Sequence, residues 1–105
     1  MTRHRIASCA DVPEGKALLV DIGERRLLVC NVAGAFCAID DVCTHDGGPL
    51  GEGALQGEEI ECPRHGARFN VCSGRPTAMP AVQPVKAYKI DVADGGLYVE
   101  IDDVW

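Results

Sequence analysis

The chain has 105 residues, of which 47% are hydrophobic and 25% charged, and its formal net charge is −6. These values are ordinary for one globular domain. The 16 acidic residues outnumber 10 Lys and Arg, which argues against a nucleic-acid partner because phosphate binding needs clustered basic side chains.

The apolar segments are too short for membrane insertion or export. None approaches the roughly 18 residues of a membrane span, and no apolar stretch follows the N-terminal arginines as it would in a signal peptide. We therefore expect a cytoplasmic protein with no membrane partner. Its six cysteines then indicate a metal site more than a disulfide framework, because cytosolic thiols stay reduced.

Short apolar runs separated by glycine-containing turns predict antiparallel β-hairpins before and after a loop-rich middle. There is no sustained helical period, and the six prolines argue against long helices. The expected fold class is all-β, with five or more strands. The predicted strands, in chain order, are 16–22, 26–32, 35–40, 85–92 and 97–101.

The middle of the chain carries the candidate ligands on loops. Residues 46–57 contain five glycines in twelve positions, which leaves little capacity for regular structure. Two short motifs flank this stretch, a Cys-x-His pair and a Cys-x-x-His pair separated by sixteen residues. The four candidate metal ligands are Cys43, His45, Cys62 and His65.

Two metals could use these four side chains. Structural zinc binds two Cys and two His, but its usual fingers place a Cys pair before a His pair. Here each loop mixes one Cys with one His, an arrangement that suits two irons, because each loop can place its Cys on one iron and its His on the other. The pattern favours a two-iron centre and leaves a zinc-held interaction module as the alternative.

The stretch "CTH…CPRHG" resembles the signature of the Rieske [2Fe–2S] proteins. The resemblance implies one [2Fe–2S] cluster, with Cys43 and Cys62 on the inner iron and His45 and His65 on the outer, solvent-facing iron. It also implies a Rieske-type fold of three small antiparallel sheets. Residues 1–105 would form a single domain, in which a cluster-binding subdomain at about 41–76 is inserted in a β base.

Departures from the high-potential members of the family indicate a low-potential type. Those members have two extra cysteines, where this chain has Gly48 and Arg64, and Ser and Tyr hydroxyls, where it has Ala67 and Phe69. A hydrogen-bond donor to a cluster sulfur stabilises the more negative, reduced state, so its absence lowers the potential.

A cluster with four protein ligands has no open site for a substrate, so we expect an electron carrier without catalytic residues. The resemblance implies that such a ferredoxin passes electrons from an NAD(P)H-dependent flavin reductase to a terminal aromatic-ring-hydroxylating oxygenase. An alternative within the resemblance is the small Rieske subunit of an NADH-dependent nitrite reductase.

The remaining cysteines and the third histidine receive simpler interpretations. Cys9 and Cys72 are expected to be free thiols. Cys30 and Cys37 should face each other if Ala33-Gly34 is a two-residue turn. We expect them to be reduced and packed, with a disulfide between them as the second possibility. The remaining histidine, His4, lies in a polar start and is expected to be exposed.

Overall fold

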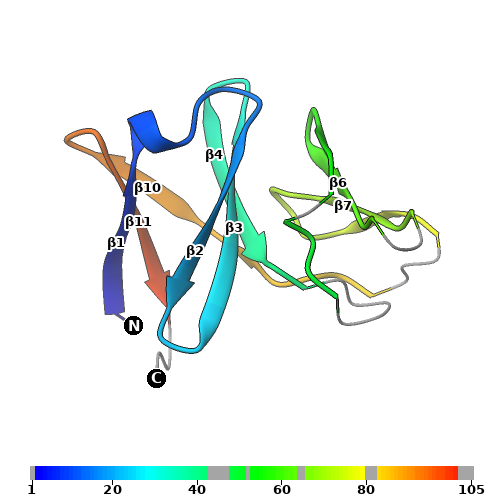
Figure 1. Cartoon of the computed structure of the whole chain (residues 1–105). Coiled ribbons are helices and arrows are strands. Elements are labelled where there is room, and N and C mark those ends of the chain that lie inside the picture. Colours follow the sequence, from blue (N-terminus) through cyan, green and yellow to red (C-terminus); the bar gives the residue numbers. More distant parts are fainter. Residues whose placement is uncertain (1, 43–47, 52, 64–65, 80–82, 102–105) are drawn as a thin grey trace.

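The structure is a computed structural model that describes residues 2–42, 48–51, 53–63, 66–79 and 83–101. It confirms the all-β prediction, with three antiparallel sheets arranged side by side (Figure 1). Within these ranges the helical structure consists of one 3₁₀ turn, η1 (Cys9–Asp11). No helix in the described part of the chain is both long enough and apolar enough to cross a membrane.

We call the three sheets terminal, central and motif. The terminal sheet has the order β1 (Thr2–Ser8), β11 (Gly96–Ile101) and β10 (Ile90–Ala93). The central sheet has the order β2 (Ala17–Ile22), β3 (Arg25–Val32), β4 (Ala35–Asp40) and β9 (Ala87–Tyr88). The motif sheet has the order β5 (Leu55–Gln56), β6 (Glu59–Glu61), β7 (Arg68–Asn70) and β8 (Pro76–Ala78).

The hairpin turns lie where the glycine pattern predicts them. Between β3 and β4, Ala33 and Gly34 have φ values of 51° and 93°. Positive φ at both central residues gives the turn that matches the right-handed twist of the two strands. Asp94 and Gly95 connect β10 to β11 in the same way, with φ values of 51° and 74°.

The central sheet is covered on both faces, and β3 shows this most clearly. Leu28 and Cys30 belong to a buried cluster shared with Phe69 of the motif sheet. Leu27 and Val29 belong to a second cluster shared with the terminal sheet. Because successive side chains of a strand point to opposite faces, this double burial explains why β3 is a continuous apolar run with little alternation.

Two sequence predictions were wrong, the continuous strand 85–92 and the exposure of His4. The predicted strand 85–92 is divided at Lys89, because β9 pairs with the central sheet and β10 with the terminal sheet. The polar start forms β1, in which His4 pairs with Val99. His4 is half-buried, and its Nε2 is shielded from solvent without a hydrogen-bond partner in the described structure. Pairing with β11 covers this residue, which local polarity could not predict.

Candidate metal centre

Of the four predicted ligands, the structure describes Cys62. Cys43, His45 and His65 lie outside the described residues. Cys62 directly follows β6, carries a free thiol, and is 1% exposed.

A tight turn fixes the backbone of Cys62. Its amide donates to the carbonyl of Ala67 at 2.6 Å, and its own carbonyl accepts from the amide of Gly66 at 3.1 Å. Gly66 has a φ of 75°, a left-handed conformation that glycine adopts without steric cost. Cys62 therefore lies at the end of β6, where the connection to β7 begins.

An Asp carboxylate closes the segment that contains the first motif. Asp41 Oδ1 accepts hydrogen bonds from the amides of Leu50 at 2.9 Å and Gly51 at 2.6 Å. The Leu50 side chain is fully buried in the same hydrophobic cluster as Cys62, and Val42 packs against this cluster. The described residues that flank the first motif therefore share one core with Cys62 of the second motif.

Gly53 allows the two motif segments to approach each other closely. A Cβ atom at this position would overlap the backbone carbonyl oxygen of Glu61, the residue before Cys62. The Gly53 amide donates to the Leu50 carbonyl at 2.9 Å, and the Glu61 amide donates to the Ala54 carbonyl at 3.2 Å. One member of the glycine-rich stretch is therefore required by packing against β6.

Two described side chains that share the cluster of Cys62 have no hydrogen-bond donor. Ala67 and Phe69 are fully buried in its cluster, and neither side chain can donate a hydrogen bond. Iron–sulfur clusters are held by Cys thiolates, and their potentials depend on hydrogen bonds to sulfur and on solvent exposure. A free, buried cysteine among apolar side chains fits such a cluster.

The surface charges next to the hairpin are paired. Arg68 Nη2 lies 3.0 Å from Glu61 Oε1, and Nη1 lies 3.8 Å from Glu59 Oε1. These side chains are about 40% exposed, so the pairs contribute little to stability. They offset acidic charge at the strand that leads to Cys62.

A hydrogen-bonded tyrosine holds β9 against β4, just before the first motif. The Tyr88 hydroxyl donates to Asp40 Oδ1 at 2.6 Å and accepts from Arg25 Nη1 at 2.8 Å. Desolvation and the bond to Asp40 raise the pKa of Tyr88 to about 12. The phenol therefore stays neutral and donating at physiological pH, and it anchors the strand that ends at Asp40.

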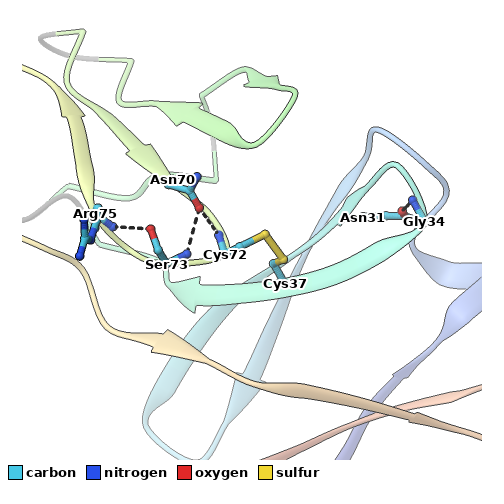
Figure 2. The surroundings of a disulfide bond; sticks show 7 residues. All are labelled: Asn31, Gly34, Cys37, Asn70, Cys72, Ser73 and Arg75. Atoms are coloured by element: carbon cyan, nitrogen blue, oxygen red, sulfur yellow. Dashed lines mark hydrogen bonds between the residues drawn. A yellow bond between two sulfur atoms is a disulfide. The ribbon is translucent and has the colours of Figure 1, made fainter.

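The cysteine predictions are partly wrong. Cys37 and Cys72 form a disulfide, with a Cα–Cα distance of 4.8 Å (Figure 2). Cys37 lies opposite Cys30 across the hairpin, as predicted, yet Cys30 is free and buried, and Cys9 is also free. The partner of Cys37 is instead a cysteine 35 positions away, which the folded motif sheet brings next to β4.

Three features at this site were missed by sequence reasoning. No sequence pattern distinguished Asp41 as the acceptor that closes the first loop or Cys72 as a disulfide partner. Gly53 lies in the glycine-rich stretch, so its freedom from a side chain was visible, although its contact with β6 was not.

Comparison with known proteins agrees with this geometry. A model of the Rieske [2Fe-2S] domain matches residues 2–89. The ferredoxin CarAc of Metapseudomonas resinovorans is 38% identical over 96 residues, which cover 90% of each chain. The Sphingomonas yanoikuyae B1 ferredoxin superimposes with a TM-score of 0.91 at 31% identity, covering 96% of this chain and 100% of that one. A chain of the complex of reduced oxygenase and oxidized ferredoxin in carbazole 1,9a-dioxygenase superimposes with a TM-score of 0.87 at 37% identity, covering 92% of this chain and 91% of that one.

The chain belongs to the Rieske [2Fe–2S] family. Within this family it is a ferredoxin of the dioxygenase-component type, an electron carrier with one [2Fe–2S] cluster. Full-length similarity to these ferredoxins favours the iron–sulfur interpretation over the zinc alternative.

Proposed function

We propose that Cys43, His45, Cys62 and His65 hold the [2Fe–2S] cluster, with the two Cys on the inner iron and the two His on the outer iron. The observation that supports this most directly is the buried free thiol of Cys62 at the hairpin end, in one core with the flanks of the first motif. When bound, the cluster accepts and releases one electron. Replacing two of the four thiolates of a plant-type cluster by neutral imidazoles raises the potential.

The protein residues set how easily that electron is added. Ala67 and Phe69 exclude water from Cys62 and offer no side-chain donor. At the two positions where high-potential members have extra cysteines, this chain has Gly48 and Arg64. Because donors to sulfur stabilise the reduced state, we assign a potential in the lower part of the Rieske range.

The proposed partners are an NAD(P)H-dependent flavin reductase, which supplies the electron, and a terminal aromatic-ring-hydroxylating oxygenase, which receives it. A ferredoxin of 37% identity is solved in complex with an oxygenase, which supports the second partner. Membership of the family supports the reductase as the first partner, and the proposed location is the cytoplasm, where NAD(P)H is available. The chain carries the electron between these partners and performs no reaction on the aromatic substrate.

Substitution of the described ligand tests the proposed ligand set. Cys62→Ser should abolish the visible absorption of the cluster and the paramagnetic resonance signal of the reduced protein, because the inner iron loses a thiolate. Cys9→Ser is the matched control, since Cys9 is also a free thiol but lies at η1, away from the motif sheet, and should leave both signals unchanged. A Cys62→Ser protein with both signals intact would contradict the assignment.

Replacing a histidine tests its position on the outer iron. His65→Cys adds a negative charge at the iron and should lower the potential if the cluster assembles. Voltammetry of the loaded variant measures this change. An unchanged or higher potential would show that His65 is not an iron ligand.

A further inference from the structure

The Cys37–Cys72 disulfide joins two sheets. Cys37 lies on β4 of the central sheet, and Cys72 lies in the turn that follows β7 of the motif sheet (Figure 2). The bonded pair encloses the segment 38–71, which contains all four proposed cluster ligands. The disulfide therefore ties together the two ends of the ligand-bearing segment.

A cleft gives access to this disulfide from solvent. Cys37 and Cys72 both line a cleft of about 420 Å³, whose other walls include Phe36, Lys89 and Ile90. Both cysteines are only half-buried. The cleft walls are mixed in polarity and carry the exposed ammonium group of Lys89, which favours the approach of a thiolate because opposite charges attract.

The turn around Cys72 is fixed independently of the sulfur–sulfur bond. Asn70 Oδ1 accepts hydrogen bonds from the amides of Cys72 at 2.8 Å and Ser73 at 2.9 Å, as Figure 2 shows. The amide of Gly74 donates to the Asn70 carbonyl at 2.8 Å, and the amide of Val85 donates to the Gly74 carbonyl at 2.9 Å. These bonds would keep the turn that carries Cys72 in shape after the disulfide opens, so that the bond can form again, although none of them ties the turn to β4.

The neighbouring thiol of Cys30 does not perform the exchange. Cys30 is opposite Cys37 across the strands and is fully buried. Burial raises the pKa of this thiol to about 12, and the nucleophile in thiol–disulfide exchange is the thiolate. The attacking thiol must therefore come from outside, through the cleft.

We propose that the Cys37–Cys72 disulfide is a thiol-exchange site, opened by a dithiol reductant that enters this cleft, and that it controls how firmly the motif sheet is held against the central sheet. The first reductant thiolate attacks one sulfur and forms a mixed disulfide, while the other cysteine leaves as a thiolate and takes a proton. The second reductant thiol then displaces the first cysteine. The dithiol loses two electrons and two protons, and Cys37 and Cys72 become free thiols.

The proposed cytoplasmic location supports exchange over a permanent crosslink. Disulfides in cytosolic proteins are usually transient, and the cytosol maintains dithiol reductants. The effect on the cluster rests on the proposed ligand set, because the enclosed segment carries those ligands. Exchange at the disulfide does not rest on it and can be measured separately.

The first experiment measures exchange itself on the cluster-loaded protein. Dithiothreitol is added under anaerobic, native conditions, and mass spectrometry after alkylation counts the free thiols at Cys37 and Cys72. We expect reduction at a rate that low urea does not change. Lys89→Glu should slow it several-fold, and the matched control Lys86→Glu, which makes the same charge change outside this cleft, should leave it nearly unchanged.

Three results would overturn the proposal. Reduction that requires unfolding concentrations of urea would make the disulfide a closed structural link. Equal rates in both lysine variants would remove the cleft as the entry route. Thiols that are already free in the isolated protein and do not pair with oxidised dithiothreitol would exclude the site altogether.

The second experiment measures the consequence for the cluster. Dithiothreitol should accelerate the loss of cluster absorbance of the wild-type protein several-fold at mild temperature. Cys37→Ser/Cys72→Ser should lose its cluster at that faster rate with or without the reductant. An equal effect of dithiothreitol on the double variant and the wild type would show that the reagent acts on the cluster and would overturn control by the disulfide. Failure of cluster assembly in Cys62→Ser tests the ligand set alone, so the two proposals can fail separately.

Discussion

Removal of the disulfide should lower the free energy of unfolding by an amount that its position in the chain specifies. The crosslinked residues are 35 positions apart. In the chain-entropy treatment, a closed loop of this length corresponds to about 3.8 kcal/mol at 25 °C. Stabilities of small domains are about 5–15 kcal/mol, so Cys37→Ser/Cys72→Ser should lose a large fraction of its stability.

Native-state hydrogen exchange is the appropriate assay, because it follows brief reversible openings of the cluster-loaded protein, whereas heating until the chain stays unfolded releases the cluster irreversibly. The amides of β3, which is buried on both faces, report global opening. A change of about 3.8 kcal/mol predicts exchange roughly 600-fold faster in the cluster-loaded double variant. Cluster release is common to both proteins and cancels in the comparison.

Cys9→Ser is the matched control and should leave the β3 exchange rates unchanged. The reduced wild-type protein should match the double variant. A difference below about 1 kcal/mol between the variant and the oxidised wild type would refute the reasoning, because it would show that the unfolded chain gains little freedom when the bond is absent.

Three further predictions address the cluster environment, the buried thiol and the glycine-rich loop. Ala67→Ser should raise the potential by about 40 mV, the one-electron equivalent of about 1 kcal/mol from a hydroxyl donor to sulfur. Ala38→Ser, the same change in the other core, should leave the potential unchanged. Equal voltammetric potentials for Ala67→Ser and the wild type would exclude such a donor. The pKa of the Cys30 thiol is raised from 9.0 to about 12, so its stabilising contribution is present below pH 9 and lost between pH 9 and 12. The free energy of unfolding should therefore fall less steeply over this pH range in Cys30→Ala than in the wild type. Gly53→Ala should reduce cluster content strongly because its Cβ meets the backbone of β6. Gly57 has a φ of 61° but open space around it, so Gly57→Ala should cost about 1 kcal/mol of stability and retain the cluster. Equal cluster content in the two variants would contradict the packing argument.

The hairpins and the class of metal centre could be predicted from local sequence, whereas the contacts around the site could not. The strands and the turns at Ala33-Gly34 and Asp94-Gly95 could be predicted because strand alternation and positive φ depend on a few adjacent residues. The cysteine and histidine spacing predicted a two-iron centre, and the family match supports the cluster. Of the ligands, only Cys62 lies in the described part of the chain.

Tertiary structure determined the features that depend on residues distant in the sequence. The polar N-terminal segment forms strand β1 because it pairs with β11, and this pairing covers His4. Cys37 has a cysteine directly opposite on the next strand, yet its disulfide partner is Cys72, because stacking of the motif sheet on the central sheet brings that turn to β4. Hairpin geometry follows from local backbone preferences, whereas the choice of a disulfide partner follows from how whole sheets bury their apolar faces against one another.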